Sequence, residues 1–259
     1  NSAADTAYEV ANSCRFNDDD SPKMTRTNPS ENSTDQDEGT YSWWMKPTTS
    51  TSTQYIVAVE SGSERFLWYY NQNTFAGGYR DSDGSPNIDF AISPAAKFRD
   101  PAAWYHCVLT WDTDQATAAN RLRFYVNNVE YTVTQSEELP SGQVMPQNKN
   151  AFNGTTLFAA TDSSSEYDGY IAEFVFIDGQ QLTPSSFAEA DEDSPTIWKP
   201  KDVSDLTFGN LGYYLDFEDS DNLGDDESGN GNDFTETNLA ATDQATDTPT
   251  NNFCTLNPA

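Results

Sequence analysis

Between positions 122 and 133 the sequence reads Leu122-Arg123-Phe124-Tyr125-Val126-Asn127-Asn128-Val129-Glu130-Tyr131-Thr132-Val133. Apolar side chains recur at every second position on both sides of Asn127-Asn128, which is the period of a strand with one buried face. Asparagine tolerates the positive φ that both central residues of a type I′ turn adopt. The stretch therefore predicts a β-hairpin with a two-residue turn.

The same period continues outward along the chain. Strands are predicted at 41–45, 55–59, 66–70, 88–92, 104–111, 156–160, 170–177 and 213–217. A short helical turn is predicted at 183–187, where Thr183 precedes a proline at the first helical position. Many strands beside so little helix predict an all-β sandwich.

The composition is strongly acidic and excludes several classes of protein. The chain has 259 residues, 42 Asp and Glu against 13 Lys and Arg, and a net charge of −29. Without a cluster of basic residues, neither nucleic acid nor an anionic membrane surface is an expected partner. No apolar run approaches the ~20 residues of a membrane-spanning helix. Aromatic residues make up 13% of the chain, which favours a folded protein.

Histidine and cysteine are scarce. The single histidine, His106, excludes a His-rich metal site. The three cysteines are Cys14, Cys107 and Cys254, and none belongs to a CxxC motif. Cys107 lies inside an apolar strand pattern, so we expect it to be a buried free thiol.

One domain is predicted, in two parts. Residues 1–188 form the sandwich core, and residues 189–259 form an acidic C-terminal segment with 17 acidic residues and two lysines, a net charge of −15. This segment is expected to add the strand at 213–217, a candidate cation loop at 225–233 and an extended tail. More than half of the total charge therefore lies outside the predicted core.

Three segments carry a resemblance to a known family. They are Ser42-Trp43-Trp44-Met45-Lys46-Pro47, then Trp104-Tyr105-His106-Cys107-Val108 continued by 122–127, and the run 168–184. They resemble strands of laminin-G/concanavalin A-like jelly rolls. The resemblance implies a jelly-roll β-sandwich of two antiparallel sheets, a fold that carries binding, enzymatic and structural functions.

A narrower resemblance concerns the runs 98–106, 176–187 and 226–234. They are similar to laminin-G-like tail-fibre and virion-surface proteins of tailed phages, a kind abundant in marine phages. This resemblance implies a non-enzymatic virion structural protein at the virion surface, a tail fibre or a capsid decoration, that can bind a host glycan. Its partners would be other virion proteins or copies of itself, as a trimer if it is a fibre. The alternatives are a secreted or cell-surface lectin-like adhesin of a marine microbe and a glycoside hydrolase of the same fold.

No catalytic residues are predicted. Glucanases of this superfamily need carboxylates that alternate on one strand face, and Asp216-Phe217-Glu218 supplies only two. Glu173 and Asp178 are five positions apart and fall on opposite faces of a regular strand. His106 lies in mid-strand, where we expect a structural role. The sequence therefore predicts a protein that is not an enzyme.

A calcium site is the sharper hypothesis, and it lies in the loop 225–233. The loop reads Asp225-Asp226-Glu227-Ser228-Gly229-Asn230-Gly231-Asn232-Asp233 and crowds carboxylate and amide oxygens, the ligands that calcium prefers. It resembles a loop near a structural calcium in many laminin-G-like domains, in which Asp226 and Asn232 match best. Asp225 is a further predicted ligand, and Asp168 is predicted to contribute from outside the loop. The alternative is a turn held by side-chain hydrogen bonds.

The predicted glycan-binding residues are Trp68, Tyr70 and Tyr79. Sugar binding needs exposed aromatic rings, and these three lie near Gly77-Gly78 in a candidate strand pair. Alternation places Trp68 and Tyr70 on one face of their strand and Tyr69 on the other. The alternative is that these rings belong to the core. Four other tryptophans lie in central strands and are predicted to be core, namely Trp43, Trp44, Trp104 and Trp111.

Overall fold

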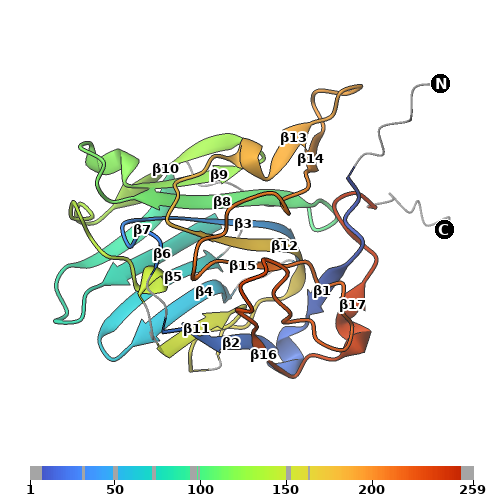
Figure 1. Ribbon diagram of the computed structural model, residues 1–259, viewed down its shortest axis with the longest axis horizontal. Coiled ribbons are helices and arrows are strands. Elements are labelled where there is room, and N and C mark those ends of the chain that lie inside the picture. The colour runs from blue at the N-terminus through green and yellow to red at the C-terminus, as the bar shows by residue number, and fades with distance from the viewer. Residues whose placement is uncertain are drawn as a thin grey trace.

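The computed structural model describes residues 8–30, 33–48, 52–71, 74–93, 98, 100–149, 153–162 and 164–251. Two antiparallel sheets pack face to face, and the described helical elements are all short 3-10 turns (Figure 1). The predicted all-β jelly-roll sandwich of two antiparallel sheets is confirmed. No described helix is long and apolar enough to span a membrane.

We call the first layer sheet A. Its strands follow the order β17-β1-β12-β3-β8-β9-β10, and β15 pairs with the second half of β12. Their bounds are β1 (Ser13–Phe16), β3 (Glu38–Pro47), β8 (Tyr105–Asp112), β9 (Leu122–Val126), β10 (Val129–Gln135), β12 (Gly169–Asp178), β15 (Tyr213–Leu215) and β17 (Gln244–Ala245).

We call the second layer sheet B, with the order β16-β2-β11-β4-β5-β6-β7-β10. Its further strands are β2 (Lys23–Thr27), β4 (Thr53–Ser61), β5 (Glu64–Asn71), β6 (Thr74–Arg80), β7 (Asn87–Ser93), β11 (Asn153–Leu157) and β16 (Thr235–Thr237). The first part of β10 pairs with β9 and its second part with β7, so β10 joins the two sheets. β13 (Ala188–Ala190) and β14 (Trp198–Pro200) form a separate hairpin, and its Ala188 and Trp198 pack with Trp44 on the outer side of sheet A (Figure 1).

The predicted hairpin at 122–133 is present as β9 and β10. Asn127 and Asn128 both have positive φ, at 46° and 64°, as the two-residue turn requires. The predicted turn near Thr183 is also present, as η4 (Pro184–Ser186).

Aromatic rings fill the space between the sheets. Trp43 of sheet A lies 6.1 Å from Phe174, and Trp68 of sheet B lies 5.1 Å from Phe124, measured between ring centroids. Cys107 is buried in this core as a free thiol, as expected. Cys254 lies outside the described residues.

A second hydrophobic layer covers the outer face of sheet A. Val203, Phe208 and Tyr214 of the acidic C-terminal segment pack with Val108 and Val175 of the sheet. A smaller cluster beside it contains Trp44 and Trp104. The four tryptophans predicted to be core are therefore all buried, two of them between the sheets and two outside sheet A.

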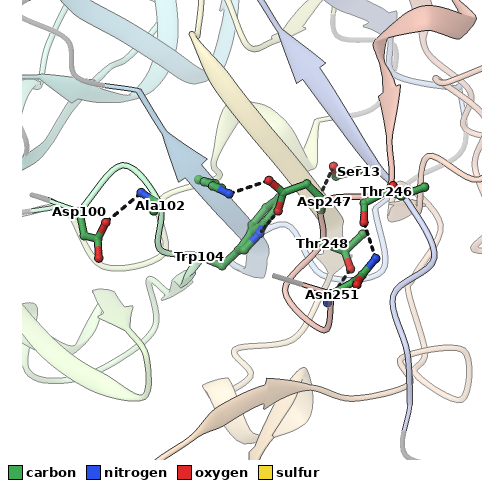
Figure 2. Close-up of polar contacts among 9 residues, drawn as sticks. Ser13, Asp100, Ala102, Trp104, Thr246, Asp247, Thr248 and Asn251 are labelled. Atoms are coloured by element: carbon green, nitrogen blue, oxygen red, sulfur yellow. Dashed lines mark hydrogen bonds and ion pairs between the residues drawn. The ribbon is translucent and has the colours of Figure 1, made fainter. Parts of the chain in front are cut away.

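The tail of the chain returns to the start of the sandwich. β17 pairs with β1, and Asp247 connects three distant elements (Figure 2). Its carboxylate accepts hydrogen bonds from Lys46 Nζ at 2.6 Å and Trp104 Nε1 at 3.0 Å, and its backbone carbonyl accepts one from Ser13 Oγ at 2.7 Å. The tail up to Asn251 thus packs on the domain, and the residues after it lie outside the described part.

Two predicted strands have different ends. The strand predicted at 213–217 stops at Leu215, because Phe217 has a φ of 62° and leaves the extended conformation. The strand predicted at 156–160 runs from Asn153 to Leu157 and stops before Phe158, whose φ is 65°. The short strands β1, β2, β16 and β17 were not predicted, since they have too few residues for a clear period.

Candidate functional site

The three predicted glycan-binding rings are in the core. The side chains of Trp68, Tyr70 and Tyr79 are fully buried between the sheets. A ring that is closed off from solvent cannot contact a glycan, so this prediction is wrong and the alternative that they are core residues holds. The physical reason is that the face of β5 carrying Trp68 and Tyr70 turns toward sheet A.

The loop 225–233 is organised by the Asp226 carboxylate. Its Oδ1 accepts hydrogen bonds from the backbone N–H of Tyr214 and of Ser228, both at 2.9 Å. Its Oδ2 accepts from Ser228 Oγ at 2.8 Å and from the Asn232 N–H at 2.7 Å. Asn232 in turn donates its side-chain N–H groups to the carbonyls of Asn210 and Gly212. The Asp226 carboxylate as acceptor and the Asn232 amide as donor thus hold the loop as a closed turn.

A cation already lies beside this loop. The guanidinium of Arg26 is buried and donates to the carbonyls of Asn232 at 3.2 Å and Leu211 at 2.9 Å. It also lies over the ring of Tyr213, 4.7 Å from the centroid. The positive charge next to the loop therefore comes from the chain itself.

The four predicted calcium ligands are not brought together. Asp225 accepts only from Asn222 Nδ2 in the described structure. Asp168 accepts from the Thr48 hydroxyl just before β12, whereas Tyr214, which contacts Asp226, pairs with Val175. Asp168 and Val175 are seven residues apart along the strand, which corresponds to a distance of about 20 Å. Within the described residues no three His, Cys, Asp or Glu side chains form a group that could hold a metal.

Calcium binding itself stays a hypothesis, and melting curves test it. Because internal donors satisfy the Asp226 carboxylate, we expect the same melting temperature in calcium and in EDTA. A rise of several degrees with calcium would instead show that the ion stabilises the folded state.

The carboxylates weighed for catalysis do not form an alternating set. Asp216 accepts the Glu218 N–H at 2.9 Å, so the two residues belong to a turn after β15. Glu173 sits at a bulge of β12 with a φ of 51°, and its carboxylate accepts the hydroxyls of Tyr8 and Tyr214. The geometry that a glucanase needs on one strand face is absent at 216–218.

His106 is a structural histidine. Its Nδ1 accepts the Trp198 indole N–H at 3.0 Å, so its Nε2 carries the proton and donates to Ser42 Oγ at 2.9 Å. Burial lowers the pKa of His106 to about 3. An imidazole that donates its proton to the serine hydroxyl cannot remove one from it.

The outer face of sheet B presents a different set of side chains. We call it the tyrosine face and define it by outward residues of β4 to β7, namely Tyr55, Ala58, Glu60, Arg65, Leu67, Tyr69, Ala76, Gly78, Arg80 and Asp89. The rings of Tyr55 and Tyr69 are cross-strand partners whose centroids lie 5.3 Å apart, and both are partly exposed. Small residues at 76 and 78 leave the neighbouring surface shallow. No second hydrophobic layer covers this face in the described structure.

A pocket of about 200 Å³ opens beside the tyrosine pair. Tyr55, Glu60, Arg65 and Leu67 line its sheet side, and residues 160–162, 164 and 165 line the other. This segment is held in place because the Tyr55 N–H donates to the Ser165 carbonyl at 3.0 Å, and the Thr161 hydroxyl donates to Glu60. The pocket therefore combines aromatic, apolar and charged groups.

The tyrosine hydroxyls are donors at neutral pH. Burial raises the pKa of both Tyr55 and Tyr69, and the nearby carboxylates of Glu60 and Asp89 raise the pKa of Tyr55 and Tyr69, respectively. Each ring thus offers a flat apolar face and a protonated hydroxyl, which is the combination that a sugar ring can contact.

The sequence pattern placed Tyr69 on this face but did not predict it to bind a glycan. The alternation in β5 placed Tyr69 opposite Trp68 and Tyr70, and that assignment is confirmed. The pattern carried no information on which of the two faces would be covered. The pocket wall at 160–162, 164 and 165 comes from a segment about 100 residues away and had no local signal.

A comparison with family models agrees with the fold. Residues 20–186 match a family model described as the concanavalin A-like lectin/glucanases superfamily. The CBM40 module of a Ruminococcus gnavus IT-sialidase bound to α2,3-sialyllactose is 13% identical, with a TM-score of 0.47, over 67% of this chain and 92% of the module. Domains LG4-5 of the mouse laminin α1 chain are 9% identical, with a TM-score of 0.45, over 70% of this chain and 45% of theirs. No curated protein matches the chain.

Proposed function

The chain belongs to the concanavalin A-like lectin/glucanases superfamily, and we propose that it is a non-enzymatic glycan-binding protein whose ligand lies on the tyrosine face. The observation that supports this proposal is the partly exposed pair of Tyr55 and Tyr69 beside the pocket, on a sheet face that the described C-terminal segment does not cover. The superfamily also contains enzymes, so the fold alone does not select binding. We favour binding because the partly exposed Tyr55 and Tyr69 rings lie beside polar side chains that line the pocket.

A glycan array with two variants tests the site. Tyr69→Ala is expected to weaken binding about ten-fold or more, because loss of one contacting ring costs about 1.4 kcal/mol or more. Tyr55→Ala should weaken the same glycans, since the two rings form one surface. Ile197→Ala removes an exposed apolar side chain from the separate β13–β14 hairpin and serves as the control with unchanged binding.

Two results would contradict this assignment. Equal binding by the wild type and both tyrosine variants, with unchanged melting temperatures, would remove the tyrosine face as the site. Turnover of laminarin or an agar-type polysaccharide that Asp216→Asn abolishes would show that the protein is an enzyme.

The place we propose for this binding is the surface of a virion, as a tail fibre or capsid decoration, with other virion proteins or copies of the chain as partners. The support is the resemblance of the runs 98–106, 176–187 and 226–234 to appendage proteins of tailed phages. Antibodies against the chain should then label purified virions. Labelling of a microbial cell surface would assign the protein to the adhesins instead.

A further inference from the structure

Two arginines face each other on the tyrosine face. Arg65 of β5 and Arg80 of β6 are direct cross-strand partners, so their side chains leave the sheet on the same side. Like charges in directly opposite positions destabilise a sheet unless an anion lies between them. The pair therefore calls for a negative partner.

Neither arginine forms an ion pair with a described carboxylate. Arg65 forms no ion pair with any described residue, and its Nε is buried without a hydrogen-bond acceptor. Arg80 donates its Nε to the Ser63 carbonyl at 2.6 Å and likewise forms no ion pair there. Five other described cations form ion pairs with carboxylates, namely Arg15, Lys46, Arg123, Lys149 and Lys199.

The nearest carboxylates have other partners. Glu60 of β4 is the cross-strand neighbour of Arg65 on the side away from Arg80; one oxygen of its carboxylate accepts the Thr161 hydroxyl, and no ion pair joins it to Arg65. Asp162, at the edge of the pocket, accepts from the N–H and the hydroxyl of Ser164. Arg65 lines the pocket, and Arg80 lies next to it on β6; both side chains are partly exposed.

We propose that the tyrosine face binds a glycan through a carboxylate-bearing sugar, whose carboxylate lies between Arg65 and Arg80. A guanidinium binds a carboxylate with two parallel hydrogen bonds, which gives both affinity and orientation. Tyr69 lies four residues from Arg65 along β5, about 13 Å away, and Arg65 and Tyr55 line the same pocket. A neighbouring sugar of the same oligosaccharide then rests on the tyrosine pair. This inference rests on the proposed glycan-binding function.

Matched pairs of acidic and neutral glycans test the proposal. The probes are oligogalacturonate with its carboxyl-reduced form, and sialyllactose with lactose, so that uronate and sialate sources are distinguished. We expect the wild type to bind at least one acidic probe at least ten-fold more tightly than its neutral match, and added salt to reduce this preference. Arg65→Met should remove the preference for the acidic probe over its neutral match.

Control variants separate this inference from the proposed function. Lys199→Met removes one positive charge from the β13–β14 hairpin and should keep the preference for the acidic probe. Tyr69→Ala should weaken acidic and neutral probes alike. If the wild type binds each pair equally, or if Arg65→Met keeps the preference with an unchanged melting temperature, the carboxylate assignment is wrong although glycan binding stands. If both tyrosine variants also bind as the wild type does, the site itself is wrong.

Discussion

Replacing Asp226 with alanine is expected to lower the free energy of unfolding by about 3–5 kcal/mol, since each hydrogen bond to a charged group contributes ~1.5–3 kcal/mol and unsatisfied buried donors add a further cost. The side chain is 9% exposed, and its two oxygens accept four hydrogen bonds. Alanine would leave the N–H groups of Tyr214 and Asn232 without their acceptor in a buried place. The substitution would also remove the hydrogen bond from the Tyr214 N–H to the Asp226 carboxylate, which connects the loop to β15.

Urea unfolding measures this effect, with Asp225→Ala as the matched control. Asp225 lies next in the chain and carries the same charge, but its side chain accepts one bond, from Asn222 Nδ2 at 3.1 Å. Its loss should cost no more than about 1 kcal/mol. Equal destabilisation by the two variants would mean that the closed turn does not depend on Asp226.

Replacing Glu173 with glutamine is expected to make the protein more stable than the wild type at alkaline pH. Glu173 is 5% exposed, and burial raises its pKa from 4.5 to about 7, while the hydroxyls of Tyr8 and Tyr214 donate to the same oxygen and limit the rise. The structure offers no cation as its ion-pair partner among the described residues. The charged form is therefore the less favourable one in the folded state.

The direction of the pH effect follows from this raised pKa. Because the folded protein holds the proton more tightly than the unfolded chain, the stabilising contribution is complete below pH 4.5 and is lost as the pH rises through about 7. A shift of this size corresponds to about 3 kcal/mol. Glutamine keeps the shape of the side chain and cannot ionise, so its stability should not show this loss.

Unfolding free energies of wild type and Glu173→Gln across this pH range provide the measurement. Burial also raises the pKa of Asp216 to about 6, so the difference between the two proteins, and not the wild-type curve, isolates Glu173. Glu192→Gln, in an exposed loop, is the control that should follow the wild type. Parallel curves for wild type and Glu173→Gln would show that this carboxyl does not titrate in the buried position assigned to it.

The local part of the fold was predictable because strand and turn signals are local. The alternation on either side of Asn127-Asn128 predicted the β9–β10 hairpin, and the Trp68–Tyr70 alternation predicted which rings share a face. The end of β15 was not predictable in the same way. Phe217 is apolar and continues the pattern, but its positive φ belongs to a turn that tertiary contacts hold, including Gln244 donating to its carbonyl.

The candidate site depended on contacts between distant segments. Oxygen-rich composition at 225–233 suggested a cation, and the structure places there Arg26, about 200 residues earlier in the chain. Arg65 and Arg80 are both visible in the sequence, but their opposition appears only when β5 pairs with β6 in this register.

The amino-acid sequence by itself thus determined the all-β sandwich, the hairpin and the two faces of β5, because a period of two and a turn with positive φ involve only neighbouring residues. The tertiary structure alone decided which of those faces is partly exposed and which is core. The acidic C-terminal segment covers sheet A with Val203, Phe208 and Tyr214, whereas no such hydrophobic layer covers the outer face of sheet B in the described part of the chain. Burial is set by what packs against a strand, and for both sheets that partner comes from far away in the chain.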